Sequence, residues 1–191
     1  VSGEVKCWGA GDQGQLGSGG FEDIGVERTQ MGEGIEPVEF AGAAASIHAS
    51  GNQSCLVTSA FKLWCWGSGP ASVELQPTPA NIVFEDIERV ACGWLHCCVA
   101  VRGGALKCWG DGGDGRLGAG DVLSRGIDEA VAVPGVLGYI VALAAGDCHT
   151  CATLVNFQVR RGTLLFEVSP AITAPGQRRE GASSMQQQMP R

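Results

Sequence analysis

Short apolar runs, bounded by glycine-rich polar segments, make up most of this chain. Examples are Phe40–Ile47, Ile87–Ala91 and Ile140–Ala145, each preceded by a segment that contains proline. Long polar segments of helical character are few, and 30 of the 191 residues are glycine. Because short apolar runs between turn residues are typical of strands, we predict an all-β protein. The three runs are candidates for the innermost strand of a repeated unit.

The polar and apolar positions recur with a fixed phase. The tripeptide Cys-Trp-Gly occurs three times, beginning at Cys7, Cys65 and Cys108. A segment of the form Gly-x-x-Gly-x-Leu-Gly follows twice, as Gly11–Gly17 and Gly112–Gly118. A repeat of this kind decides the fold ahead of any single motif. The sequence therefore predicts a repeat protein.

Two of the repeats contain a predicted hairpin with one cysteine in each strand. The spacing from Cys55 to Cys65 equals the spacing from Cys98 to Cys108, and the second hairpin turns at Gly103, a residue that adopts positive φ without strain. Each pair of cysteines is then directly opposed, at a separation that a disulfide can bridge. We predict both disulfides. The alternative is that cysteine serves only as a small apolar residue at a buried repeat position.

Charge is distributed unevenly along the chain. Hydrophobic residues make up 45% of it, which excludes a wholly disordered protein. Residues 1–156 hold 8 Lys and Arg against 18 Asp and Glu, whereas residues 157–191 hold 5 against 2. An acidic body repels phosphate, so we expect no nucleic-acid partner, whereas a basic protein partner fits. The uncharged stretch Ala130–Gly146 contains proline and glycines, which favour a turn and a buried strand over a membrane span.

Two acidic segments, Ser18–Glu36 and Asp111–Glu129, interrupt the repeats. A solvated loop explains them most simply, but insertions of this kind are also where repeat proteins place partner contacts. The candidate partner-binding residues are Glu22, Asp23, Glu27, Asp111, Asp114 and Asp121.

Taken in order, the lead-in glycine, His-x-Cys, Cys-Trp-Gly and Gly-x-Leu-Gly resemble the regulator-of-chromosome-condensation repeat family over roughly residues 4–155. The resemblance implies four-stranded blades of a β-propeller, with tryptophans between neighbouring blades and the leucines in the core. Secreted members of the family look similar in carrying the opposed cysteines. Disulfides would imply an extracellular or lumenal protein, and their absence a cytoplasmic one. The expected blade-core residues are Trp8, Trp66, Trp109, Leu16, Leu117, His96 and His149.

The chain holds about three full or partial blades, fewer than a closed ring needs. We divide it into blades over residues 1–156, a degenerate last strand over 157–168 and a disordered tail over 169–191. The first Cys-Trp-Gly lies close to Val1, and no initiator methionine precedes it, so we expect a fragment. The ring would then be completed by missing blades or by another chain.

Two groups of Cys and His residues have spacings that zinc could use, but no second matching Cys-x-x-Cys accompanies them. Because His96 and His149 share one repeat phase, a structural role for both is favoured over metal binding. The Gly-x-Gly-x-x-Gly motifs at Gly9–Gly14 and Gly110–Gly115 are not followed by the helix that a dinucleotide site requires. We therefore expect no cofactor. The two groups are Cys92, His96, Cys97 and Cys98, and Cys148, His149 and Cys151.

Trp94 resembles a tryptophan of the family's plant UV-B photoreceptor, but Asn52 and Asp147 stand at the equivalent positions, and Leu95 replaces the neighbouring arginine. Neither a Ser-His-Asp arrangement nor a paired carboxylate motif stands apart from the repeat, so we predict no enzyme activity. The predicted function is a protein-interaction or scaffold module. Family analogy leaves open guanine-nucleotide exchange on a small GTPase, or a repeat segment of a larger ubiquitin ligase.

Overall fold

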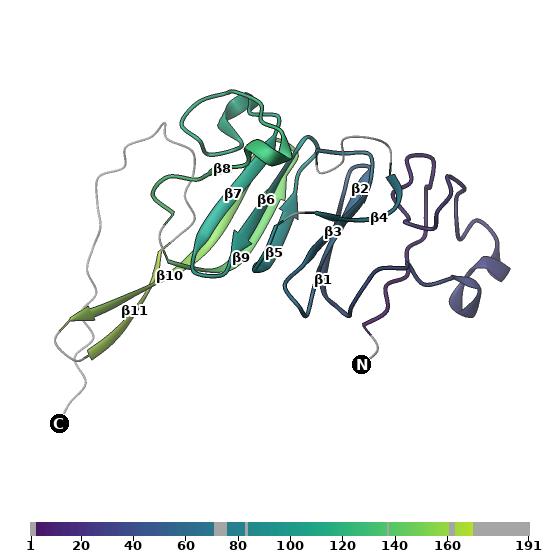
Figure 1. Ribbon diagram of the computed structural model, residues 1–191, viewed down its shortest axis with the longest axis horizontal. Helices are drawn as coiled ribbons and strands as arrows, with labels where there is room; N and C mark the ends of the chain where they lie inside the picture. The colour runs from purple at the N-terminus through teal and green to yellow at the C-terminus, as the bar shows by residue number, and fades with distance from the viewer. Residues whose placement is uncertain (1–2, 71–75, 83, 137, 161–162, 170–191) are drawn as a thin grey trace.

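The computed structural model describes residues 3–70, 76–82, 84–136, 138–160 and 163–169 (Figure 1). Within these ranges the regular structure consists of strands and short 3-10 helices, which confirms the all-β prediction. No helix among them is long and apolar enough to cross a membrane. The 3-10 helices are η1 (Arg28–Gln30), η2 (Gly32–Gly34), η3 (Gly113–Gly115) and η4 (Ile127–Glu129).

The first two sheets are four-stranded and antiparallel, and in each the strands follow their order in the chain. Cys55 is directly opposed to Cys65 and Cys98 to Cys108, which confirms the predicted register of both hairpins. The first sheet contains β1 (Ala44–Ser50), β2 (Gln53–Thr58), β3 (Leu63–Gly67) and β4 (Gln76–Ile82). The second contains β5 (Ile87–Cys92), β6 (His96–Val101), β7 (Ala105–Gly110) and β8 (Val131–Ala132).

The third sheet is three-stranded, with β10 (His149–Arg160) between β9 (Tyr139–Gly146) and β11 (Thr163–Ser169). We predicted a degenerate last strand over residues 157–168, in which Phe166 takes the place of the hairpin cysteine. In the structure β10 continues to Arg160, β11 spans Thr163–Ser169, and Phe166 pairs with Phe157. The reason is that no glycine follows Cys151 until Gly162, so the hairpin has no early turn of the kind that Gly103 and Gly104 make with positive φ. The predicted tail lies, apart from Ser169, outside the described residues.

The three sheets stand side by side as successive blades, with β1, β5 and β9 as adjacent inner strands (Figure 1). Between the first and second blades, Cys55 and Cys65 share one buried cluster with Trp109. Between the second and third, Cys98 and Cys108 share another with Ile140 and other third-blade residues. The opposed hairpin cysteines of each of these two blades thus face the blade that follows, whereas Cys92 and Cys97 of the second blade face the first. Sulfur in contact with an aromatic ring adds to this apolar burial.

The N-terminal segment supplies the outer part of a preceding blade. The Val38 N–H donates to the Val5 carbonyl at 2.8 Å, as the Val133 N–H donates to the Leu106 carbonyl at 2.9 Å. Val5 stands two residues before Cys7, just as Leu106 stands two residues before Cys108. Residues 5–9 and the chain around Val38 are therefore the counterparts of β7 and β8. Val5 and Val38 are buried with Leu56 and Trp66 of the first blade.

Candidate protein-binding face

Two long connections of equal design follow residues 5–9 and β7, the third-strand segments of successive blades. We call residues 9–38 the first loop and residues 110–133 the second loop. Gly9 and Ile24 exchange two backbone hydrogen bonds of 2.8 and 3.0 Å, and Gly110 and Arg125 exchange two of 2.7 and 2.8 Å. In the sequence, both bridges lie the same number of residues after the preceding Cys-Trp-Gly. The repeat therefore extends through the loops.

The second glycine of each loop, Gly11 or Gly112, allows the two limbs of the loop to touch. A Cβ atom on Gly11 would collide with the carbonyl oxygen of Glu22, and one on Gly112 with that of Leu123. Only glycine permits so close an approach of two backbone segments. This requirement explains the recurrence of glycine at this phase of the sequence.

Each loop also binds the blade that follows it. The carbonyl oxygen of Gln15 accepts hydrogen bonds from Trp66 Nε1 and Ser54 Oγ, both at 2.9 Å. At the same phase of the second loop, the Arg116 carbonyl oxygen accepts a bond of 3.1 Å from Thr150 Oγ1.

The neighbouring Leu16 and Leu117 are buried as predicted, and so are Trp66 and Trp109, which are 0% exposed. These four side chains fill the spaces between blades. The loops are therefore part of the scaffold at their base and free only at their tips.

His96 links the second blade to the third. Its Nε2 lies 2.8 Å from Thr150 Oγ1, and because that hydroxyl donates to the Arg116 carbonyl, Nε2 must be the donor. Burial, together with the nearby Arg116 guanidinium, lowers the pKa of His96 to about 4. The ring lies against Gly93, where a Cβ atom would collide with it. His96 is thus a neutral structural residue that interacts with the Thr150 side chain and with the His149 backbone of the next blade.

Two expected blade-core residues are not in the core. Trp8 is 61% exposed, because the inner strands that would flank it are not present in the described part of the chain. His149 is also exposed, with its ring against Gly146 at the edge of the last blade. Both residues lie at the ends of the array, where the described residues supply a neighbouring blade on one side only.

The cysteines form three disulfides within the described residues. Cys55–Cys65 and Cys98–Cys108 are the pairs that we predicted, each with a Cα–Cα distance of 4.1 Å. The third, Cys92–Cys97, joins β5 to β6 across their turn. We missed it, although five-residue spacing across a hairpin turn is a usable signal.

The three cysteines near His96 that we considered as zinc ligands, Cys92, Cys97 and Cys98, are all in disulfides. Among the residues described, no group of three or more His, Cys, Asp or Glu side chains could hold a metal ion. Cys7, Cys148 and Cys151 are free.

The acidic residues of the two loops differ in their partners. In the second loop, Arg116 lies 3.4 Å from Asp111 and 3.0 Å from Asp114, and Arg125 lies 2.7 Å from Asp121. The Gly113 N–H, aided by Arg116, lowers the pKa of Asp111 below its ordinary value, and the hydrogen bond from Arg125 does the same for Asp121.

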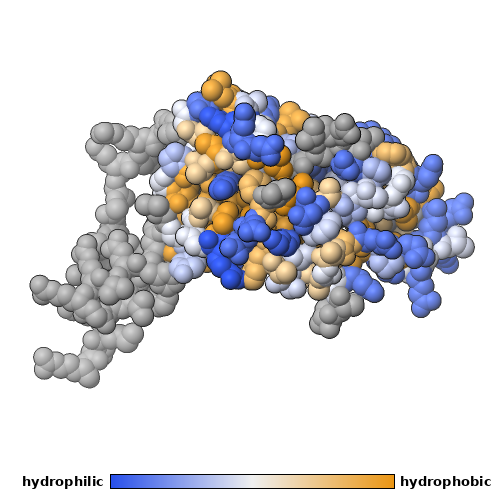
Figure 2. Space-filling model, viewed as in Figure 1, coloured by the Kyte–Doolittle hydropathy of each residue, from blue (hydrophilic) through white to orange (hydrophobic). Residues whose placement is uncertain are grey.

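In the first loop, Asp23 accepts a 2.9 Å hydrogen bond from the Gly11 N–H, and Glu22 and Glu27 are exposed. No ion pair involves these three carboxylates in the described ranges. The end of the molecule that holds η1 and η2 is largely hydrophilic in the view of Figure 2. The first loop therefore presents net negative charge, whereas the second neutralises much of its own.

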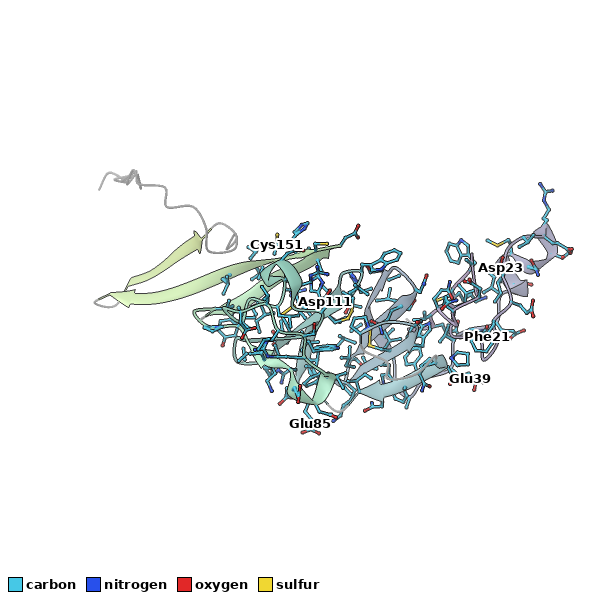
Figure 3. The ribbon with its side chains drawn as sticks, turned by 90° about the horizontal axis from the view of Figure 1, so that it is seen from above. Phe21, Asp23, Glu39, Glu85, Asp111 and Cys151 are labelled. Carbon is cyan, nitrogen blue, oxygen red and sulfur yellow. A yellow bond between two sulfur atoms is a disulfide. The ribbon has the colours of Figure 1, made fainter. Side chains whose placement is uncertain are left out.

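Exposed apolar side chains accompany these charges. The first loop exposes Phe21 and Val26, and the second exposes Val122 and Leu123. Figure 3 shows Phe21 and Asp23 together at one end of the molecule. Exposed apolar side chains with polar groups around them are typical of protein-binding surfaces.

Comparison with known proteins identifies the repeat. A family model described as the regulator of chromosome condensation (RCC1) repeat matches residues 87–116. The ultraviolet-B receptor UVR8 of Arabidopsis thaliana is 31% identical over 163 residues, which cover 80% of this chain and 36% of the receptor. The chain belongs to the RCC1-type repeat family. Human HERC2, named as an E3 ubiquitin-protein ligase, is 28% identical over 174 residues, which cover 83% of the RCC1-type chain but 3% of the ligase.

Solved structures support the same fold. Human WBSCR16 superposes with a TM-score of 0.67 at 20% identity, covering 92% of this RCC1-type chain and 50% of WBSCR16. Prp20p of Saccharomyces cerevisiae superposes with a TM-score of 0.62 at 20% identity, covering 91% and 47%. The chain therefore spans about half of each solved chain and about a third of the plant receptor.

Proposed function

We propose that this chain is a non-enzymatic protein-interaction module and that a basic protein binds its first loop. The observation that carries the proposal is the contrast in charge between the loops. The carboxylates of Glu22, Glu27 and Glu33 are exposed and, within the described residues, form no ion pair. Phe21 and Val26 lie among them and offer apolar contact. Negative charge steers a basic partner, and apolar contact holds it.

A protein partner also fits what is said of a relative. The structure of Prp20p is described together with its binding to Gsp1p and histones. That statement concerns Prp20p alone, and we take from it only the class of partner. We assign no photoreceptor role, because Asn52, Asp147 and Leu95 replace the residues on which the resemblance to the receptor would depend.

We further propose an oxidising compartment, extracellular or lumenal, because three disulfides occupy six of the nine cysteines. Such bonds are rare in the reducing cytosol. A count of free thiols in protein denatured without reductant, from the native host, tests this point. Nine free thiols would contradict it.

Binding of a basic peptide tests the main proposal. The probe is a fluorescent oligolysine, and its anisotropy is measured at low and at high salt. The triple variant Glu22→Gln, Glu27→Gln and Glu33→Gln should weaken binding by about tenfold at low salt. The matched control Asp114→Asn, Asp128→Asn and Glu129→Gln removes equal charge from the second loop and should weaken it less than about threefold. Equal effects of the two triples would overturn the assignment to the first loop.

Nucleotide exchange and ubiquitin ligation are the alternatives, and a different readout separates them. The chain covers only a part of each relative that it matches, 3% of human HERC2 and 47% of Prp20p. Release of labelled GDP from a panel of small GTPases should be unchanged by addition of the chain. Faster release would replace the proposed scaffold role by a regulatory one.

A further inference from the structure

Two cysteines of the second blade, Cys92 and Cys97, have no counterpart in the other two blades. They are opposed across the β5–β6 hairpin, one pair nearer to the turn than Cys98. The pair at the same place is Ala49 and Ser54 in the first blade, and Ala145 and Thr150 in the third. The repeat therefore does not require the Cys92–Cys97 disulfide, and this bond serves something other than the common scaffold of the blades.

A disulfide of the first blade lies directly against this bond. The Sγ atoms of Cys55 and Cys92 are 3.9 Å apart across the interface between the two blades. Both residues and their bonded partners, Cys65 and Cys97, belong to one buried cluster and are at most 1% exposed. Disulfides exchange when a thiolate attacks a sulfur of another disulfide. A thiolate at Cys92 would have such a sulfur within reach.

The backbone holds Cys92 close to Cys55. His48 is directly opposed to Cys55 in the β1–β2 pair, and its Nε2 lies 2.9 Å from the Cys92 carbonyl oxygen. A carbonyl oxygen can only accept, so Nε2 donates. This hydrogen bond joins the two blades at the level of the two sulfurs. The approach of Cys55 and Cys92 is therefore supported by strand pairing and by a side-chain bond, in addition to the sulfur contact itself.

The interface between the second and third blades has a different chemistry. Thr150 takes the place of Cys97 there, and its Oγ1 lies 3.6 Å from the Sγ of Cys98. Neither this hydroxyl nor the methyl group of Ala145 can exchange with a disulfide. The Cys98–Cys108 disulfide thus supplies an internal comparison for the one between the first two blades.

The Cys92–Cys97 bond lies closer to an exposed turn than the Cys55–Cys65 bond does. It joins the last pair before the β5–β6 turn, in which Trp94 is 57% exposed. Two further residue pairs separate Cys55–Cys65 from its end of the β2–β3 ladder. Strand ends open locally more readily than strand interiors. A small dithiol reductant should therefore reach the Cys92–Cys97 bond first.

We propose that Cys55, Cys65, Cys92 and Cys97 form a thiol–disulfide exchange site whose co-reactant is a dithiol. At this site the two disulfides within blades are replaced by one disulfide between blades, Cys55–Cys92. The new bond joins β2 to β5, so mild reduction links the first blade covalently to the second. The proposal does not rest on the function proposed above.

Two steps give this product. In the first, the dithiol reduces Cys92–Cys97, transfers two electrons and two protons to these cysteines and becomes a cyclic disulfide. In the second, the Cys92 thiolate attacks the Sγ of Cys55, so that the Cys55–Cys92 bond forms and the Cys55–Cys65 bond breaks. Cys65 leaves as a thiolate and takes up the proton that Cys92 lost. The second step is an isomerisation, so only the first consumes reductant.

The product constrains the chain differently from the bonds that it replaces. Cys55 and Cys92 are 37 residues apart in the sequence, whereas the replaced bonds close loops of 10 and 5 residues. A disulfide that closes a longer loop restricts the unfolded chain more. The new bond should therefore hold the first two blades together when their noncovalent interface is weakened.

Two single variants test the second step without any reductant. Cys97→Ser and Cys92→Ser remove the same disulfide, but only Cys97→Ser leaves a thiol at Cys92. Each full-length chain is treated with N-ethylmaleimide and digested with trypsin without reduction, and linked peptides are identified by mass spectrometry. Trypsin cuts between Cys55 and Cys65 and again before Cys92, so the bonds can be told apart.

In Cys97→Ser, a Cys55–Cys92 bond should appear together with alkylated Cys65. It should be at least about tenfold more abundant than any bond from Cys55 to the remaining thiol of Cys92→Ser. That thiol belongs to Cys97, whose Sγ lies 3.2 Å from the Gln53 amide oxygen. Equal cross-linking in the two variants, or an intact Cys55–Cys65 bond in both, would overturn the proposal.

Titration of the unaltered chain with dithiothreitol tests both steps and does not depend on the folding of a variant. One equivalent per chain should give the Cys55–Cys92 bond, with alkylated Cys65 and Cys97, whereas Cys98–Cys108 should stay intact. Chains in which Cys92–Cys97 is reduced and Cys55–Cys65 persists would overturn the proposal. Reduction of Cys98–Cys108 as readily as of Cys55–Cys65, without a bond between blades, would also overturn it.

Discussion

The first and second loops share a backbone but not a charge pattern. Both begin with Cys-Trp-Gly, close a bridge at Gly9–Ile24 or Gly110–Arg125, and hold the next blade through one carbonyl group. In the second loop arginines bind three of the aspartates, whereas within the described residues no ion pair involves a carboxylate of the first loop.

The base of each loop and its tip therefore have different roles. We call the bridge, the close glycine contact and the buried leucine of each loop its frame, and these residues recur at a fixed phase. The residues that distinguish one loop from the other lie outside that phase. Function is therefore to be sought in what the two loops do not share.

The largest effect is expected for the buried leucines. Leu117→Ala and Leu16→Ala each leave a cavity between blades and should lower the free energy of unfolding by about 3 kcal/mol. If the two loops have the same frame, the two losses agree to within about 1 kcal/mol. Urea unfolding followed by tryptophan fluorescence measures both. A loss at one leucine only would show that the frames differ.

A loss of unfolding free energy of comparable size is expected at acid pH from His96, a residue of the second blade. The folded pKa of His96 is about 4 and the ordinary value is 6.5, so the unfolded chain binds a proton more readily. Its contribution to stability is complete above pH 6.5 and is lost as the pH falls through 4, by up to about 3 kcal/mol.

Gln53 occupies the same phase in the first blade and does not titrate. His96→Gln should therefore flatten the dependence of unfolding free energy on pH between 6.5 and 4. Urea unfolding at a series of pH values measures the slope. An unchanged slope in the variant would assign the pH dependence to other groups.

A smaller effect is expected for the hydroxyl groups that bind the loops. Thr150→Val leaves His96 Nε2 and the Arg116 carbonyl without their partner and should cost about 2 kcal/mol. Ser54→Ala should cost about 1 kcal/mol, because Trp66 still donates to the Gln15 carbonyl. Thermal unfolding gives the ranking. The reverse order would mean that the second loop is held mainly by other contacts.

The smallest effect is expected for a change of charge alone. Arg125→Gln releases Asp121 from its ion pair and makes the second loop more like the first. Binding of the oligolysine probe should tighten by less than about threefold, and stability should change little, because Asp121 is exposed to solvent. Weaker binding would show that the arginine contacts the probe.

Much of the fold could be predicted because the repeats of this chain can be aligned with one another. The phase of Cys55 and Cys65 fixed the hairpin register, and the recurring leucines identified the core. Prediction failed where the repeat ends. Trp8 and His149 have the same sequence context as buried counterparts, but burial depends on a neighbouring blade, which a residue's own sequence context does not show.

The candidate site was predictable only in part. The acidic segments were evident, but the pairing of Asp111 and Asp121 with arginines depends on loop conformation. His48, which carried no signal in the sequence, bonds the Cys92 carbonyl of the next blade at 2.9 Å. Contacts of this kind, between residues far apart in the chain, have no local pattern.

The three disulfides of the described chain have a mechanical consequence. Each closes a loop of five or ten residues inside one hairpin, and none joins two blades. Cys55 and Cys92 of neighbouring blades come within 3.9 Å, yet each is bonded within its own sheet. Under tension on the chain ends, β2 would stay joined to β3, and β5 and β7 to β6, while the noncovalent contacts between neighbouring blades break. The disulfides keep paired strands of a sheet together, and the noncovalent interfaces between blades determine the force at which the blades separate.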